Sequence, residues 1–363
     1  MKNLGLYIHI PFCLRKCPYC DFYSLEFNED LKNQYVSAVV ACIKRFADRG
    51  RKVDSIYFGG GTPSLLSEND VFQILETANK CFSVSNAEIT MEANPSSATF
   101  EKLLGYRKSG VNRISFGIQS LNDLELSDLG RLHDSKTAIG SINNAVKAGF
   151  NNLSADLMLG ISRQTETSLM NSISVLSSLD IKHVSAYMLS IEERTPYARM
   201  RNSLLLPDEE KTADLYLATC NELEKYGFEQ YEISNFSVKG FESRHNLKYW
   251  QLEEYLGIGP AAHSFYNGKR SYYPRDIRNF IDGDFSMLPD DTFNPSEEYV
   301  MLSLRLKSGL DLKTACEYGV DIQTLLEKAQ RFIKQRLVIL DNDRLHLTKE
   351  GFLVSNYIIS ELI

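Results

Sequence analysis

The sequence predicts an α/β protein: an open, partial (β/α)6 barrel followed by a small α+β domain. Two observations support this prediction. Six short β-rich runs alternate with amphipathic helical stretches over the first two thirds of the chain, and the last part changes to helices and a hairpin. Strands that alternate with helices form parallel sheets with right-handed crossovers.

The strand–helix units follow one another without interruption. The predicted strands cover residues 4–10, 53–59, 87–93, 111–118, 152–159 and 182–189. The predicted helices cover residues 29–47, 68–81, 98–109, 135–148, 165–178 and 208–226. Six units are two short of a closed eight-stranded barrel, so we expect an open sheet with its functional residues at the carboxyl ends of the strands.

Composition divides the chain into three parts. Residues 1–232 carry the strand–helix units, whereas residues 233–290 are rich in Tyr, Phe, Gly and Asn and indicate a connecting segment. Residues 291–363 predict a winged-helix-like domain, with a hairpin in "LVILDNDRLHL". Its expected helices cover residues 296–306, 311–317 and 321–335, with a last helix from Thr348.

Charge and hydropathy exclude several classes of protein. The 363 residues carry a formal net charge of −7, which provides no basic surface for nucleic acid. No run of about 18 apolar residues is present to span a membrane. The N-terminal "MKNLGLYIHIPFC" is too short to be a signal peptide. We therefore expect a cytoplasmic protein, with its oligomeric state, including a homodimer, left open.

Three cysteines stand close together in "HIPFCLRKCPYCDFYS", at Cys13, Cys17 and Cys20. A structural zinc closes its shell with four ligands, whereas three thiolates leave one position open. Zinc with His9 as the fourth ligand is an alternative. The remaining cysteines have apolar neighbours, and we expect them to be small buried hydrophobic residues. These are Cys42, Cys81, Cys220 and Cys316.

Further polar residues follow the other predicted strands. "GGGTPS", residues 59–64, follows the second strand, and its glycines would let backbone amides approach a ligand closely. The side chains at the later strand ends are Glu92, Gln119, Arg131 and Asp156. Together these groups offer two carboxylates for hydroxyls or amines and an arginine for a carboxylate. A small zwitterionic ligand with a ribose would use all of them.

The C-x3-C-x2-C loop, with Tyr19 just before its last cysteine, resembles the radical S-adenosylmethionine (SAM) superfamily. The resemblance implies that Cys13, Cys17 and Cys20 hold three irons of a [4Fe-4S] cluster, and that the fourth iron binds SAM. It further implies the residues of the SAM pocket. These are Tyr7, Tyr19, Gly60, Gly61, Thr62, Glu92, Gln119, Arg131 and Asp156.

A series of motifs resembles one branch of that superfamily, which contains oxygen-independent coproporphyrinogen III oxidase and the haem chaperones of the HemW group, and the resemblance covers essentially the whole chain, including the small C-terminal domain. They are "YIHIPFC", "CDFYS", "FGGGTPS", "EANP", "SFGIQS", "LGRLH" and "DLMLG". Two features depart from the oxidase pattern. Phe22 stands where the oxidase loop has a fourth cysteine, and only twelve residues precede Cys13.

"RHNLKYW", residues 244–250, matches the H-N-x-x-Y-W motif of the haem-chaperone group. The match implies that His245 is a candidate ligand for haem iron, with Tyr249 and Trp250 packing on the porphyrin. The alternative is a buried loop in which these residues fill core. His263, in "GPAAHSF", ranks second because its glycine and alanine neighbours suggest close packing.

The resemblance thus implies a haem chaperone that carries a [4Fe-4S] cluster and SAM. Its cargo is haem, and its partners are haem-accepting proteins such as membrane respiratory enzymes. A radical SAM oxidase that decarboxylates coproporphyrinogen III is the alternative, and a zinc-bound structural protein is the third hypothesis.

Overall fold

The computed structural model describes residues 3–363 and confirms the α/β fold. The main sheet has twelve strands in the order β14-β13-β12-β11-β1-β4-β5-β6-β7-β8-β10-β9. Its centre consists of the six predicted strands, each parallel to the next. They are β1 (Leu4–Ile10), β4 (Asp48–Gly60), β5 (Phe82–Ala93), β6 (Arg113–Gln119), β7 (Leu153–Leu159) and β8 (His183–Met188).

The central strands are buried on both faces, which explains their continuous apolar sequences. In β1 every residue except Tyr7 is buried, and in β7 every residue except Asp156 is buried. In-register neighbours such as Leu6 and Ile56 place apolar side chains side by side across the strands. Both exceptions carry a polar group, and both were predicted as site residues.

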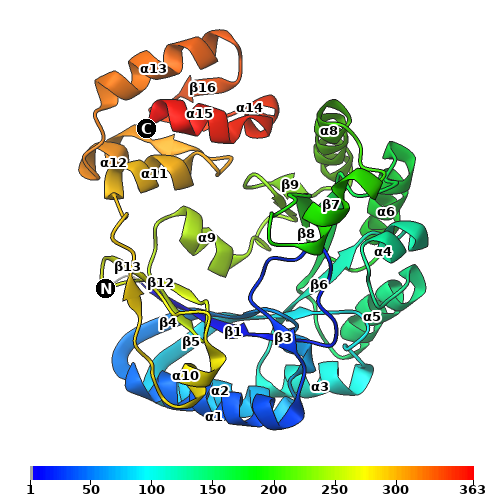
Figure 1. Cartoon of the computed structure of the whole chain (residues 1–363). Coiled ribbons are helices and arrows are strands. Elements are labelled where there is room, and N and C mark those ends of the chain that lie inside the picture. The colour runs from blue at the N-terminus through cyan, green and yellow to red at the C-terminus, as the bar shows by residue number, and fades with distance from the viewer. Residues whose placement is uncertain (1–2) are drawn as a thin grey trace.

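The helices that connect these strands cover the outer face of the curved sheet (Figure 1). They are α1 (Glu29–Arg45), α2 (Glu68–Cys81), α3 (Phe100–Ser109), α4 (Asp123–Asp128), α5 (Ser135–Lys147) and α6 (Glu166–Ser178), and α8 (Glu209–Lys225), which follows β8, packs beside α6. The short α7 (Pro196–Met200) instead packs near Pro18, whose carbonyl accepts a hydrogen bond from the Tyr197 amide at 3.0 Å. Strong capping signals explain why most of their boundaries were predictable. For example, Asn28 accepts a hydrogen bond from the amide of Leu31 and begins α1.

The segment 233–290, predicted as a connection, contributes strands to both edges of the main sheet. β11 (Tyr255–Ile258) pairs parallel with β1, and three antiparallel strands continue outward from it. They are β12 (His263–Tyr266), β13 (Lys269–Tyr272) and β14 (Leu288–Pro289). At the opposite edge β10 (Asn235–Ser237) and β9 (Glu229–Gln230) pair antiparallel beyond β8. The segment also contains the helices α9 (Arg244–Trp250) and α10 (Ile277–Ile281).

The C-terminal part combines helices with a three-stranded antiparallel sheet in the order β15-β17-β16, as a winged-helix-like domain requires. Its strands are β15 (Leu310–Asp311), β16 (Val338–Asp341) and β17 (Arg344–Leu347). Its helices are α11 (Pro295–Ser303), α12 (Leu312–Glu317), α13 (Ile322–Lys334), α14 (Lys349–Leu353) and α15 (Ser355–Leu362). The single last helix predicted from Thr348 is therefore two helices, α14 and α15.

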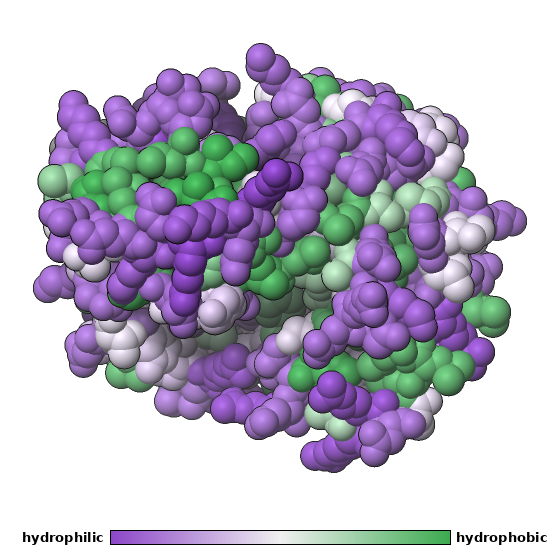
Figure 2. All heavy atoms as spheres, turned by 90° about the horizontal axis from the view of Figure 1, so that it is seen from above, coloured by the Kyte–Doolittle hydropathy of each residue, from purple (hydrophilic) through white to green (hydrophobic). Residues whose placement is uncertain are grey.

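The molecular surface adds two findings. Seen from above, hydrophobic patches lie between hydrophilic residues (Figure 2). Within residues 3–363, no helix is long and apolar enough to cross a bilayer.

The expectation that all four remaining cysteines are buried is wrong for Cys316, which is exposed at the end of the short helix α12. Cys42, Cys81 and Cys220 are buried, as expected.

Candidate functional site

The carboxyl ends of the parallel strands surround one cavity of about 370 Å³. Its lining includes all three cysteines of the N-terminal loop together with most of the predicted pocket residues. These are Cys13, Cys17, Cys20, Tyr19, Gly60, Gly61, Thr62, Glu92, Gln119, Arg131 and Asp156. Residues spread over some 140 positions of the sequence therefore meet at one edge of the sheet, because parallel strands all end there.

The cysteine loop follows β1 and β2 (Phe12–Cys13) and is tied back by backbone hydrogen bonds. The amide of Leu25 donates to the Pro11 carbonyl at 2.7 Å, and the amide of Phe27 donates to the Cys13 carbonyl at 2.9 Å. All three thiols are partly exposed and free. The loop thus presents three thiols to the cavity from a closed Ω-like segment.

Two side chains from other loops reach the thiols. The Thr62 hydroxyl donates to Cys13 Sγ at 3.5 Å, and Arg131 Nη1 donates to Cys17 Sγ at 3.4 Å. Donors of this kind stabilise thiolates, which are the metal-binding form of cysteine. Burial nevertheless raises the pKa of Cys20, and the Phe22 backbone and Lys16 offset that shift only in part.

The expectation that the glycine amides face a ligand is wrong. The Gly60 amide donates to Glu92 Oε2 at 3.2 Å, while the amides of Gly61 and Thr62 donate to the carbonyls of Ile10 and Phe12, both at 2.8 Å. All three donors are used within the protein. The glycines are required for close packing instead, because a Cβ at Gly60, where φ is +109°, would lie 2.5 Å from the His9 ring.

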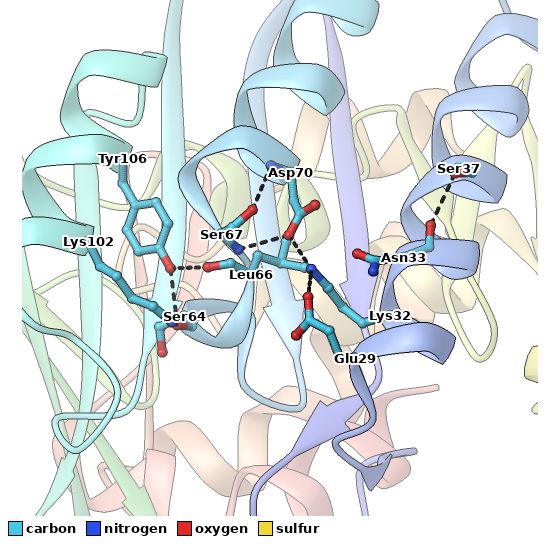
Figure 3. Close-up of polar contacts among 10 residues, drawn as sticks. All are labelled: Glu29, Lys32, Asn33, Ser37, Ser64, Leu66, Ser67, Asp70, Lys102 and Tyr106. Atoms are coloured by element: carbon cyan, nitrogen blue, oxygen red, sulfur yellow. Dashed lines mark hydrogen bonds and ion pairs between the residues drawn. The ribbon is translucent and has the colours of Figure 1, made fainter.

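The loop after these glycines is held from behind by α3 and α2, as Figure 3 shows. Lys102 Nζ and the Tyr106 hydroxyl both donate to the Ser64 carbonyl at 3.0 Å. Asp70 completes a capping box with Ser67, and its carboxylate also pairs with buried Lys32 of α1 at 2.9 Å (Figure 3). These contacts fix the part of the cavity wall that adjoins the cysteine loop at Thr62.

Glu92 and Asp156 are partly buried carboxylates on neighbouring parts of the cavity wall. Burial, reinforced by Asp156, raises the pKa of Glu92 to about 7, although Tyr57 donates to it at 2.8 Å. Burial also raises the pKa of Asp156, which accepts a hydrogen bond from Ser115 at 3.1 Å. Two carboxyl groups with elevated pKa values in one cavity are typical of a ligand site.

Arginines supply the opposite charge. Arg131 donates to the Gly117 carbonyl at 2.7 Å and to the Tyr19 hydroxyl at 3.3 Å, yet its Nε has no partner within the described chain. Arg113, which sequence reasoning missed, is 1% exposed, lines the cavity, and has no partner for Nε and Nη2 among residues 3–363. Unpaired buried guanidinium nitrogens are costly unless an anion meets them.

Gln119 ends β6 with a backbone φ of 70°, in the left-handed region that non-glycine residues rarely adopt. It lines the cavity beside the arginines. Strain of this kind costs on the order of 1–3 kcal/mol and is concentrated at functional sites. The backbone conformation therefore supports the prediction that Gln119 belongs to the site.

The zinc alternative required His9 as a fourth ligand, and the geometry argues against it. His9 Nδ1 lies 3.1 Å from the Tyr7 hydroxyl, and Nε2 lies 2.9 Å from the Tyr23 carbonyl. Both nitrogens are therefore engaged. Within the described chain no group of three or more His, Cys, Asp or Glu side chains gathers around a single point as one metal ion requires.

Tyr7 is the one predicted pocket residue that does not line this cavity. It lines an adjacent cavity of about 400 Å³, and its ring stacks on Tyr57 with centroids 6.2 Å apart. Tyr57 and Glu92 line both cavities, so the two spaces share a wall. Tyr7 therefore supports the first cavity through Tyr57, against which its ring packs.

The H-N-x-x-Y-W motif forms helix α9. His245 is fully buried, its Nδ1 lies 2.9 Å from the Ser55 hydroxyl, and its Nε2 lies 2.9 Å from the Tyr249 hydroxyl. Burial lowers the pKa of His245 to about 3. In this arrangement neither nitrogen is available to an iron, so haem ligation by His245 stays a prediction that requires α9 to move.

His263 differs from the expectation of close packing. It is exposed at the start of β12, because the turn before it points the side chain outward while Ala262 and Ser264 on either side are buried. The site also includes residues that sequence reasoning missed, among them Arg113, Tyr57, Asn94, Ser185 and Tyr187. Asn94 belongs to the motif "EANP" and Tyr187 lies near the end of β8. Arg113 begins β6, and Tyr57 and Ser185 lie inside their strands, so no sequence signal marked these three.

An open α/β sheet with a cysteine-lined cavity at its carboxyl edge is the architecture of a radical SAM protein. The model of the radical SAM superfamily matches residues 7–176, and that of the HemN C-terminal domain matches residues 295–354. The fold is similar to that of coproporphyrinogen III oxidase (HemN) from Escherichia coli, with a TM-score of 0.86, 21% identity, and coverage of 99% of this chain and 90% of that chain.

Sequence relatives narrow the class. Heme chaperone HemW from Bacillus subtilis (strain 168) is 34% identical over 96% of both chains. Radical S-adenosyl methionine domain-containing protein 1, mitochondrial, from Bos taurus is 31% identical over 100% of this chain and 88% of its own. The chain belongs to the HemW family within the radical SAM superfamily. Membership of this superfamily implies a [4Fe-4S] cluster and SAM, as the sequence predicted.

Proposed function

We propose that the chain is a haem chaperone that holds one [4Fe-4S] cluster and SAM and delivers haem to haem-requiring proteins, such as membrane respiratory enzymes. The observation that carries the proposal is the full-length similarity to proteins named heme chaperone HemW. The cavity at the sheet edge supports the cofactor part of the proposal, because its residue types match both groups.

Cys13, Cys17 and Cys20 are the proposed cluster ligands. Three thiols on one loop line one cavity, and Thr62 and Arg131 donate hydrogen bonds to two of the sulfurs. When bound, such a cluster supplies an iron that lacks a protein thiolate and is free to bind a further ligand. Hydrogen bonds to its sulfurs would help to set the potential of the cluster.

The other side of the cavity fits SAM by charge. Arg131 and Arg113 offer unpaired guanidinium nitrogens to a carboxylate, and Glu92 and Asp156 offer acceptors to an ammonium or to ribose hydroxyls. A volume of about 370 Å³ lies within the range of small-molecule sites. Gln119, Tyr19, Gly60, Gly61 and Thr62 complete the wall, and Tyr7 acts through Tyr57.

Phe22 favours the chaperone over the oxidase. Its side chain is 67% exposed and lines the mouth of the cavity, at the position where the oxidase pattern has a fourth cysteine. An enzyme that uses a carbon radical has to exclude water and oxidants from its site. An exposed aromatic ring at the mouth is better suited to contact a large apolar ligand.

One anaerobic preparation, loaded with cluster, SAM and reductant, tests the proposal in two assays. We expect uptake of about one haem per chain, since one ligand set holds one iron, and no consumption of coproporphyrinogen III. Turnover of coproporphyrinogen at enzymatic rates would establish the oxidase instead. Failure to take up haem would overturn the chaperone function.

A further inference from the structure

The histidines of the chain differ in the availability of their ring nitrogens. The buried ones are His9, His133, His183 and His245. Each of these makes at least one hydrogen bond through the ring, and in three of them both nitrogens are engaged. Burial lowers the pKa of each. These rings are structural, and an iron would have to displace an existing partner at all of their nitrogens except His133 Nδ1, which is buried.

His263 and His346 remain, and neither ring makes a hydrogen bond within residues 3–363. His346 is half-buried on β17 of the C-terminal domain, opposite Ile339. His263 is exposed at the start of β12, directly after the turn that follows the carboxyl end of β11. Because β11 runs parallel to β1, His263 lies at the same edge of the sheet as the cysteine loop.

The surroundings of His263 suit a flat ligand that carries carboxylates. Its ring is stacked with that of Tyr272 on the neighbouring strand β13, with centroids 5.4 Å apart and an interplanar angle of 26°. Arg275, whose side chain is 53% exposed, follows three residues after Tyr272. An imidazole, a partly exposed aromatic ring and a guanidinium are thus presented close together by β12, β13 and the segment that follows β13.

Two contacts join the segment after β13 to the cysteine loop. Arg275 Nη2 lies 3.9 Å from the Asp21 carboxylate, and the amide of Ile277 donates to the Tyr23 hydroxyl at 3.2 Å. Phe22, exposed between these two contacts in the sequence, adds an apolar ring to the same region. Two separate parts of the chain therefore form one surface beside the mouth of the cofactor cavity.

We propose that haem binds on this surface, with His263 as a ligand to the iron, Tyr272 and Phe22 in contact with the porphyrin, and Arg275 paired with a propionate. The inference rests on the proposed chaperone function and names the place of its cargo. The chemistry matches the ligand: imidazole binds haem iron, aromatic rings make apolar contacts with the edge or face of the porphyrin, and guanidinium pairs with carboxylate.

Exposure is an advantage for a cargo site. A haem held by one exposed histidine is accessible to a side chain of an acceptor protein, so that transfer proceeds by exchange of an iron ligand. Haem at His245 would instead require the hydrogen bonds to Ser55 and Tyr249 to break and α9 to move away from β4. The surface site needs no such rearrangement.

The test is a titration of the cluster-loaded protein with ferric haem, followed by the Soret band, for the wild type and the His263→Ala, His346→Ala and His245→Gln variants. We expect only His263→Ala to lower haem affinity, at least about tenfold, and to shift the Soret band. Free imidazole should restore the band in that variant, and His263→Met should bind haem with a different spectrum. Retained cluster absorbance establishes that each variant is folded.

Arg275→Glu tests the proposed contact with a haem propionate independently of the iron ligand. This variant should weaken binding of haem but leave binding of haem dimethyl ester, which has no free propionate, unchanged. Haem uptake by His263→Ala equal to that of the wild type would overturn this site while leaving the chaperone function intact. If only His245→Gln lost haem, the ligand would be His245. Absence of haem uptake by the wild type would overturn both proposals.

Discussion

The cavity at the sheet edge and the C-terminal domain differ in how far their charged side chains are exposed and in whether they are paired. In the C-terminal domain Arg331 pairs with Glu361, and both side chains are more than two fifths exposed. In the cavity Glu92 and Asp156 are partly buried carboxyl groups with raised pKa values, and buried Arg113 has guanidinium nitrogens without a partner in the described chain. Exposed pairs contribute little to stability, whereas buried unpaired charges reduce it.

The difference indicates that the cavity is the part of the molecule in which groups needed for function reduce stability. The Arg331–Glu361 pair of the C-terminal domain keeps its charges in water. A cavity that keeps several charges away from water needs a ligand to compensate them, and a zwitterionic ligand with a metal cluster does so. The following predictions test this contrast, from the largest expected effect to the smallest.

Replacing a cysteine of the N-terminal loop should have the largest effect. Cys13→Ala, Cys17→Ala or Cys20→Ala should each abolish the absorbance of the reconstituted [4Fe-4S] cluster, because each is proposed to bind a different iron. Cys316→Ala, at an exposed position of the C-terminal domain, is the matched control and should leave the absorbance unchanged. A complete cluster in any of the three loop variants would show that the ligand set is different.

Arg131→Ala should weaken SAM binding by tens-fold or more in calorimetry, since loss of one partner from a buried charged contact costs about 2–5 kcal/mol. The cluster should survive. Arg163→Ala is the control, because that arginine is exposed and pairs with Asp128 at 2.9 Å on the surface. Equal SAM affinities of the two variants would contradict the role of Arg131.

Glu92 should make the cofactor-free protein less stable at higher pH. Its folded pKa of about 7 lies above the ordinary value, so the folded state holds a proton that the unfolded state releases. The free energy of unfolding should therefore fall as pH rises from about 4.5 to above 7, by at most about 3 kcal/mol from this group. Glu92→Gln should remove that component. Identical pH profiles of the melting temperature for both proteins would contradict the assignment.

Thr348→Ala should have the smallest effect. The Thr348 hydroxyl accepts a hydrogen bond from the amide of Gly351 at 3.0 Å and begins α14. Its loss should reduce the free energy of unfolding in urea by about 1 kcal/mol. SAM affinity and cluster absorbance should stay at wild-type levels. A loss of SAM affinity would show that the C-terminal domain contributes to the cavity.

The parts of the fold that were predictable have strong local signals. β1 and β7 are apolar on both faces, and α1 and α2 begin at capping residues, so their patterns could be identified in sequence. β11, β12 and β13 are only four residues long and consist largely of Tyr, Gly, Ser and Lys. β11 forms because it pairs with the free edge of β1, and β12 and β13 pair outward from it. These strands therefore depend on tertiary structure and not on the local sequence.

The residues of the site likewise include some that the sequence predicts and some that it does not. The cysteines, Glu92 and Arg131 follow strands or belong to motifs, so sequence reasoning could bring them together. Arg113 begins its strand rather than ends it, and no spacing marks it as a site residue. The sequence left a buried His245 as an alternative and indicated close packing at His263, which is exposed, because burial of a histidine depends on which elements pack over it.

The measurement that tests the central claim most directly is the electron paramagnetic resonance spectrum of the reduced protein with and without SAM, combined with iron and labile-sulfide analysis. We predict about four irons and four sulfides per chain, and a spectrum that changes when SAM is added to the wild type but not to Arg131→Ala. Zinc in place of iron, or a wild-type spectrum that saturating SAM leaves unchanged, would contradict the account.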